Sequence, residues 1–212
     1  MLFTGTVEHN TFTLLHKLMR VPELDAFLLV GGTNLSLRYG HRLSVDLDLF
    51  TNEPFFRDEV YDGIRRDLPQ TRLIDQRKQT IWLTIDGVKV DVILHEYPYL
   101  KGVEEIDGIR LLAIDDIIPM KLEAMATRGV KKDFWDIAEL ANHFTLTQML
   151  TFYQQKYPNS DPGHILLTMT YFVDADVEKI DPQRLNGTTW LQVKDKLRKL
   201  VNEYVKDRVG KK

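Results

Sequence analysis

Three aspartates have the residue type and the spacing of a divalent-metal centre. Asp46 and Asp48 lie two residues apart in the alternating segment 44–49, so that in a β-strand both side chains point to the same face. Asp91 lies in a second alternating segment, 88–94, in the opposite phase to the valines. If the two strands are neighbours, the three carboxylates converge at one place on the sheet surface. Like charges this close need a cation, and we expect Mg²⁺, which prefers oxygen ligands.

A glycine pair at the end of a short apolar run supplies the second half of the pattern. The apolar residues 26–30 predict a buried strand, and Gly31, Gly32 and Thr33 follow it directly. Glycines let a backbone approach a ligand closely, and a helix that opens at this point offers unpaired N–H groups to a phosphate. The Thr33 hydroxyl is one more candidate donor. A phosphate cradle beside two carboxylate-bridged Mg²⁺ ions, which would hold the attacking and leaving oxygens of phosphoryl transfer, suits a nucleoside triphosphate.

The elements that would position these residues form a mixed α/β half and a helical half. Strands are expected over residues 26–30, 44–49, 80–85, 88–94 and 109–112, with an Asp86-Gly87 hairpin turn and a loop over 97–108. Helices are expected over residues 11–19, 33–39, 115–127, 132–144, 146–153, 164–172 and 190–205. Asp115 is the expected N-cap of its helix, with Pro119 in the first turn, where a missing N–H costs little. We therefore expect an α+β protein that divides near residue 110 into 1–110 and 111–212.

The composition excludes several classes of protein. The chain has no cysteine, which excludes a disulfide framework, a thiolate zinc site and a cysteine nucleophile. Its formal net charge of −3 argues against non-specific coating of nucleic acid, although it is compatible with a local basic patch. The N-terminus lacks the pattern of a signal peptide, and no apolar stretch approaches the roughly 18 residues that span a bilayer. We therefore expect a cytoplasmic protein that does not enter a membrane.

Two blocks of the sequence resemble a known family. Residues 31–50 look like the signature of the AbiEii/AbiGii toxin family, which belongs to the DNA polymerase β-like nucleotidyltransferase superfamily. Residues 120–124 and 128–137 are similar to that family's Lys…Arg…Lys-Asp-x-x-Asp segment, so that the resemblance covers about residues 25–142. It implies a small mixed β-sheet flanked by helices, followed by an α-helical domain. It also implies transfer of a nucleoside monophosphate from NTP to an acceptor.

The resemblance implies a role for each matched residue. Asp46 and Asp48 would hold both metal ions, and Asp91 would bind one of them and help to deprotonate the acceptor hydroxyl. Lys121 would contact the nucleotide phosphates with Arg128 as a second cation, and Asp133 or Asp136 would orient this cluster or assist the chemistry. The catalytic candidates are therefore Asp46, Asp48, Asp91, Lys121 and Asp133. The nucleotide-binding candidates are Gly31, Gly32, Thr33, Arg42, Ser44, Lys121 and Arg128.

Simpler interpretations of the same residues stay open at this point. Lys121 and Arg128 could form a solvated helix face, and Asp133 could be an acid favoured by the helix dipole. The chain could also be an inactive nucleotide-binding protein that acts through a partner. An aspartate-nucleophile phosphatase also uses an Asp-x-Asp motif, but it needs an apolar run before Asp46 and βαβ units after it, which are missing here.

The resemblance leaves the acceptor open. Members of the family act as toxins in phage defence or in toxin–antitoxin pairs, and some modify tRNA 3′ ends. A tRNA 3′ end or another RNA is therefore the favoured acceptor, with protein as the alternative, and a cognate antitoxin is a candidate partner.

Overall fold

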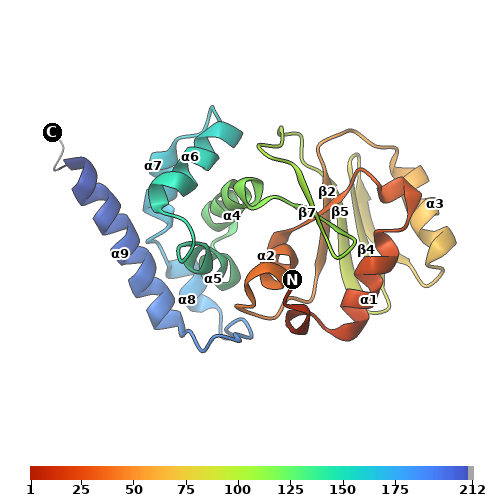
Figure 1. The fold of residues 1–212 in the computed structure, drawn as a ribbon, viewed down its shortest axis with the longest axis horizontal. Coiled ribbons are helices and arrows are strands. Elements are labelled where there is room, and N and C mark those ends of the chain that lie inside the picture. The colour runs from red at the N-terminus through yellow and green to blue at the C-terminus, as the bar shows by residue number, and fades with distance from the viewer. Residues whose placement is uncertain (210–212) are drawn as a thin grey trace. The chain divides into compact units, whose positions relative to one another are not determined.

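The computed structural model describes residues 1–209 of the chain. The chain divides into two compact units, Met1–Ala113 and Ile114–Lys212, which we call the N-terminal and the C-terminal unit. The N-terminal unit is a mixed α/β unit and the described part of the C-terminal unit is helical (Figure 1). The expected α+β class is therefore confirmed. A division at residue 110 into separate domains stays a prediction.

The N-terminal unit is built on one mixed sheet. Within the described residues, seven strands lie in the order β3-β4-β5-β2-β1-β7-β6. The neighbours β2/β5 and β1/β7 are parallel and the other pairs are antiparallel. The strands are β1 Leu28–Val30, β2 Leu47–Thr51, β3 Arg72–Arg77, β4 Thr80–Ile85, β5 Val88–Leu94, β6 Val103–Ile106 and β7 Ile109–Leu112.

The two faces of this sheet have different roles. Leu47 and Leu49 of β2 enter a hydrophobic core with residues of α1 (His9–Leu18) and α3 (Arg57–Asp67). Helix α2 (Gly31–Tyr39) also packs against β1 and β2, and Figure 1 shows it on the side of the sheet away from α3. Because side chains alternate along a strand, Asp48 points to the face that carries α2. One face therefore holds the core, and the other holds the polar residues of interest.

Two expectations for the N-terminal unit are wrong, and one strand was not predicted. Strand β2 begins at Leu47, and Val45 is an exposed residue before it. Strand β3 was not predicted, because it is an exposed edge strand without apolar alternation. The expected loop over 97–108 contains β6, which pairs with β7 through the turn at Asp107 and Gly108. Both turn residues have positive φ, as do Asp86 and Gly87 of the predicted hairpin, so the same Asp-Gly signal was present twice.

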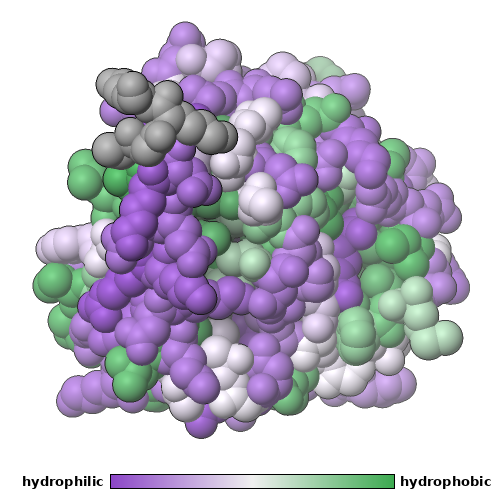
Figure 2. Space-filling view, turned by 60° about the vertical axis from the view of Figure 1, so that its left-hand side comes forward, coloured by the Kyte–Doolittle hydropathy of each residue, from purple (hydrophilic) through white to green (hydrophobic). Residues whose placement is uncertain are grey.

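The secondary-structure elements named in the C-terminal unit are all helices. Helix α4 packs against α5, α6 and α7, and α9 packs against α5 and α6. Val193 and Leu197 of α9 are fully buried, and Figure 2 shows mostly hydrophilic surface along the outer side of this helix. None of the helices in residues 1–209 is long and apolar enough to cross a bilayer. The helices are α4 Ile114–Arg128, α5 Lys131–Leu140, α6 Leu146–Lys156, α7 Pro162–Thr168, α8 Val173–Val177 and α9 Trp190–Val209.

Two expectations at the start of α4 are also wrong. Helix α5, which was expected to end at residue 144, ends at Leu140. Helix α4 already includes Ile114, so Asp115 lies inside the helix instead of capping it. Pro119 is the sixth residue of the helix, beyond the first turn, and its missing N–H removes one backbone hydrogen bond. Asp115 and Asp116 in the first turn favour this longer helix, because their negative charges lie at the positive end of its dipole.

Candidate active site

Strands β2 and β5 place the predicted carboxylates side by side. The two strands are parallel neighbours, and Asp48 is paired with Asp91. One position earlier Leu47 is paired with Val90, and the residues directly before that pair are Asp46 and Lys89. Adjacent strands lie about 4.8 Å apart, so Asp48 and Asp91 are close neighbours. Asp46 lies just before β2, outside the strand in which it was expected, and its charge acts on Lys89. The condition that the two strands are neighbours is therefore met.

Lys89 is the cation of this group, which we call the acidic cluster (Asp46, Asp48, Lys89 and Asp91). Its Nζ donates a hydrogen bond of 2.9 Å to Oδ2 of Asp91. The Lys89 side chain is 50% exposed, whereas that of Asp91 is 12% exposed. Burial acts to lower the pKa of Lys89, but the hydrogen bond and charge of Asp91 raise it more, so the pKa lies above its ordinary value. The charges of Asp46 and Asp48 add to this rise, so all three aspartates act on one ammonium group.

Asp91 supplies the test of whether a divalent cation fits here. Its Oδ1 is buried and has no hydrogen-bond partner among the described residues. A buried carboxylate oxygen without a partner is costly unless a ligand or ion satisfies it. Within residues 1–209, no group of three or more histidine, cysteine or carboxylate side chains stands ready to hold a metal ion. The carboxylate chemistry and the unsatisfied oxygen of Asp91 thus fit a hard cation, while the side chains as they stand do not form a finished three-ligand site.

The start of α2 lies directly against Asp48. Gly31 has φ +70°, and a Cβ at this position would collide with the Asp48 carboxylate. Only glycine adopts this positive φ without strain and also leaves room for the Asp48 carboxylate. No side chain of the described residues caps this end of the helix, which leaves N–H groups of its first turn for a ligand. The expected cradle is therefore a nine-residue helix that opens beside an acidic residue of β2.

Thr33, Ser44 and Arg42 surround the first turn of α2 as buried residues. The Thr33 hydroxyl donates to the backbone carbonyl of Asp46 and forms a 2.9 Å hydrogen bond with the Ser44 hydroxyl. The Arg42 guanidinium donates to the carbonyl of Leu43 at 3.0 Å and lies where a Cβ on Gly32 would be. These contacts fix the segment before Asp46 to the helix. Direct contacts of the three side chains with a phosphate stay a prediction.

The second block of predicted residues forms a buried ionic network in the C-terminal unit. The Nζ of Lys121 lies 2.7 Å from Oδ2 of Asp136 and 3.6 Å from Oδ1 of Asp133. Arg128 donates two hydrogen bonds to Asp133, at 2.6 and 2.7 Å. Both aspartate side chains are fully buried, whereas the Arg128 side chain is 49% exposed. The interpretation of Lys121 as part of a solvated helix face is therefore wrong.

Comparison with known proteins identifies the family. Residues 13–199 match the family described as "Nucleotidyl transferase AbiEii toxin, Type IV TA system". An uncharacterized protein of Aquifex aeolicus is 33% identical over 202 residues, which cover 91% of this chain and 95% of that protein. This chain belongs to the AbiEii nucleotidyltransferase toxin family. The family resemblance predicted from residues 31–50 and 128–137 is thus confirmed, as is the expectation of an enzyme of the nucleotidyltransferase class.

Solved structures share the fold of this AbiEii family member. MenT4, a nucleotidyltransferase toxin from Mycobacterium tuberculosis, is 12% identical with a TM-score of 0.60, and the match covers 91% of this chain and 82% of MenT4. JHP933 from Helicobacter pylori is 20% identical with a TM-score of 0.54, and the match covers 96% and 97% of the two chains. At such identities the likeness concerns the fold alone. It confirms the expected nucleotidyltransferase fold.

Sequence reasoning missed two residues on the outer face of the sheet of this AbiEii protein. Lys89 was missed although it lies two residues before Asp91 on the same strand, which places both side chains on one face. Trp82 of β4 is paired with Asp91 and is half-buried, and the Arg77 guanidinium lies 5.3 Å from the centre of its ring. An aromatic residue in an alternating strand looks like core when the partner strand is unknown.

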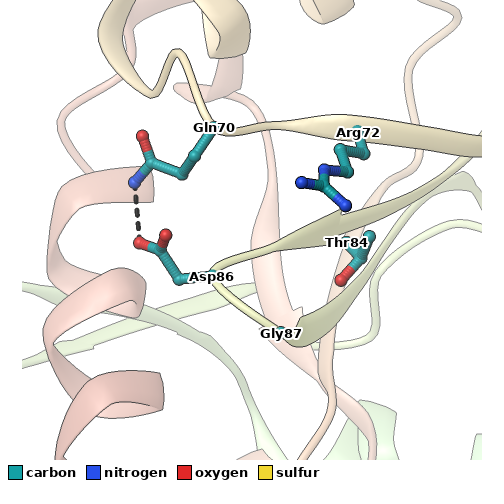
Figure 3. A pocket seen from close by; sticks show the side chains of 5 residues that line it. All are labelled: Gln70, Arg72, Thr84, Asp86 and Gly87. Carbon is teal, nitrogen blue, oxygen red and sulfur yellow. Dashed lines mark hydrogen bonds between the residues drawn. The ribbon is translucent and has the colours of Figure 1, made fainter.

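The same face continues toward a pocket at the end of the hairpin. Thr84 is paired with Lys89 on one side and with Arg72 on the other. Figure 3 shows Arg72 and Thr84 beside the turn at Gly87, in a pocket of about 250 Å³. Gln70 and Asp86 close the other end of this pocket with a hydrogen bond of 2.7 Å. A row of polar side chains thus crosses β5, β4 and β3 next to the acidic cluster.

Proposed function

We propose that this AbiEii family member transfers a nucleoside monophosphate from an NTP to an acceptor, with divalent metal ions held by Asp46, Asp48 and Asp91. The observation that carries the proposal is the buried, unsatisfied Oδ1 of Asp91 beside Asp48 in the paired strands. Carboxylate oxygens are the ligands that Mg²⁺ prefers. When bound, two such ions would stabilise the charge that develops on the phosphate and on the leaving pyrophosphate.

The residues of the N-terminal unit have distinct tasks in this proposal. The uncapped first turn of α2 binds the triphosphate through backbone N–H groups. Gly31 lets that turn approach Asp48 closely, and Thr33 keeps the backbone of Asp46 at a fixed place relative to the helix. Asp91 accepts the proton of the acceptor hydroxyl as the oxygen attacks the α-phosphate. Positioning and electrostatics thus supply most of the catalysis, as is usual for phosphoryl transfer.

The network of the C-terminal unit presents Arg128 as an anion-binding group. Asp133 accepts two hydrogen bonds from the guanidinium and fixes its plane, while about half of the Arg128 side chain stays exposed. Lys121 is committed to Asp136 and Asp133, so we assign it the support of this arrangement. Arg128 is the better candidate for direct contact with a phosphate, because a fork of N–H donors matches phosphate oxygens.

An RNA acceptor is favoured by the residues next to Asp91. Trp82 has a partly exposed ring beside Asp91, the proposed general base, and Arg77 stacks against the same ring. Aromatic rings and guanidinium groups together are typical of surfaces that stack unpaired bases. We therefore propose a single-stranded RNA end, such as a tRNA 3′ end, as the acceptor, and growth inhibition as its consequence. A cognate antitoxin would then be the biological partner.

Label transfer from α-³²P-NTP tests the proposal. Each of the four NTPs is incubated with the protein, total tRNA and Mg²⁺, and label on RNA is measured on a gel. We expect transfer from at least one NTP, none after chelation of the metal, and a loss of at least about a thousandfold in Asp48→Asn. Asp58→Asn is the matched control, because Asp58 is an exposed acid of α3 and should retain wild-type transfer.

The outcome also separates the competing functions. Label on the protein instead of RNA would indicate modification of protein and would reject the RNA acceptor. Binding of NTP without any transfer, with equal binding by wild type and Asp48→Asn, would identify an inactive nucleotide-binding protein. Transfer that survives in Asp48→Asn would show that the acidic cluster is not the catalytic centre.

A further inference from the structure

The acidic cluster contains its own counter-ion. Lys89 and Asp91 lie two residues apart on β5, so that both side chains are on one face of the sheet. Asp48 is paired with Asp91 on the neighbouring strand, and Asp46 lies just before that strand. The ammonium group binds Oδ2 of Asp91, while Oδ1 of the same carboxylate is buried and has no partner among the described residues. One oxygen of Asp91 is therefore occupied by a cation of the protein and the other is not.

We propose that Lys89 holds Asp91 in the metal-free enzyme and must release it when a divalent cation binds, so that Lys89 sets the metal concentration at which the centre fills. This inference rests on the proposed function, because it takes the acidic cluster to be the metal centre. Lys89 is then a positioning residue that acts through Asp91.

The exposure of the two side chains makes this exchange feasible. The Lys89 side chain is half exposed, and a partly exposed ion pair contributes little net stability. A lysine side chain is long and flexible, so its ammonium group can move into water while the backbone stays in place. Asp91, by contrast, is 12% exposed and has little freedom to turn away. The lysine is therefore the member of the pair that moves.

The charge of Lys89 also opposes a second cation in the same place. A divalent ion bound to Asp91 would lie within a few ångströms of the ammonium position, and like charges at this distance repel strongly in a partly buried site. Removal of the lysine charge should therefore raise metal affinity and increase the repulsion among the three acids. The metal-free protein should become less stable, and added metal should restore the loss.

Mn²⁺ binding provides a direct test that does not depend on turnover. Free Mn²⁺ is measured by electron paramagnetic resonance during titration of the wild type, Lys89→Met and the control Lys101→Met. Lys101 forms a comparable exposed ion pair with Glu104 at 3.0 Å, in the same unit. We expect roughly fivefold tighter Mn²⁺ binding in Lys89→Met, since the competing cation is removed. We expect less than a twofold change in Lys101→Met, and near wild-type binding in Lys89→Arg, which retains the charge.

Thermal unfolding with and without Mn²⁺ is the second readout. We expect Lys89→Met to melt below the wild type without metal and to gain more from Mn²⁺. If this variant does not fold, Lys89→Gln replaces it in both measurements. Unchanged or weaker Mn²⁺ binding in the folded variant would overturn the inference, and so would an equal gain in Lys101→Met. Label transfer by the wild type distinguishes the proposed function from the proposed role of Lys89. If the wild type transfers label but Lys89→Met does not bind Mn²⁺ more tightly, only the role of Lys89 is rejected. A wild type that neither binds Mn²⁺ nor transfers label would overturn both.

Discussion

The acidic cluster of the N-terminal unit and the ionic network of the C-terminal unit use the same residue types in opposite ways. The network joins two aspartates to a lysine and an arginine, and both aspartate side chains are fully buried. The cluster brings three aspartates near one half-exposed lysine, with one carboxylate oxygen left without a partner among residues 1–209. The first group is close to neutral by itself, whereas the second carries an excess of negative charge.

This difference suits the ionic network to a structural role and the acidic cluster to a catalytic one. A balanced and buried set of charges holds helices together and is damaged when one member is lost. Three carboxylates beside one half-exposed lysine at a sheet surface can accept a further cation, and ionisable groups gathered in this way are typical of a functional site. Loss of Lys89 should therefore cost the N-terminal unit much less stability than loss of Lys121 costs the C-terminal unit.

Lys121→Met should produce the largest loss of stability. The substitution leaves Asp136 buried without its 2.7 Å cation partner, and breaking a buried pair in this way costs about 3–5 kcal/mol. Lys199→Met is the matched control, because Lys199 is 76% exposed and lies 3.8 Å from Glu203. It should change the free energy of unfolding by less than about 1 kcal/mol.

Urea denaturation of the three proteins measures both values. A loss in Lys121→Met as small as in Lys199→Met would contradict the supporting role of the network. It would instead favour a direct role of Lys121 with the nucleotide, if label transfer were lost while stability was kept.

Gly31→Ala should have the next largest effect, on activity more than on stability. The positive φ of Gly31 costs a side chain about 1–2 kcal/mol, and the added Cβ also meets the Asp48 carboxylate. Because displacement of a catalytic group by about 1 Å can cost a hundredfold in rate, we expect label transfer to fall by roughly that factor.

Gly108→Ala isolates the collision from the backbone strain. Gly108 has φ +72°, close to the +70° of Gly31, but has nothing within 4 Å of its added Cβ. It should lose similar stability and keep its activity. Equal activity of the two alanine variants would mean that the contact between Gly31 and Asp48 has no catalytic importance.

The sequence predicted the part of the site that depends on local spacing. Asp46, Asp48 and Gly31 follow from alternation and from a glycine pair at a strand end, and the structure places Asp48 against Gly31. That Asp133 or Asp136 orients Lys121 was implied by the family resemblance alone and not by local spacing, because Asp136 reaches Lys121 through the packing of α4 on α5. Strand β3 was missed because an exposed edge strand has no apolar face to reveal it. Periodicity predicts which residues share a face, whereas partners across elements require the packed fold.

Trp82→Ala should have the smallest of these effects, on the acceptor alone. Trp82 is paired with Asp91, and Arg77 stacks on its ring. A nucleobase of the acceptor that stacks on the same ring would therefore lie beside Asp91, the proposed general base. Loss of one stacking contact typically costs 1–3 kcal/mol, so we expect the KM for RNA to rise about tenfold at an unchanged KM for NTP. Trp82→Phe keeps an aromatic face and should stay near wild type. If both variants raise the KM for NTP as much as that for RNA, the outer face of β4 belongs to the nucleotide and the acceptor binds elsewhere. If neither KM changes, the acidic cluster works without this face, and its difference from the balanced network lies in the metal site alone.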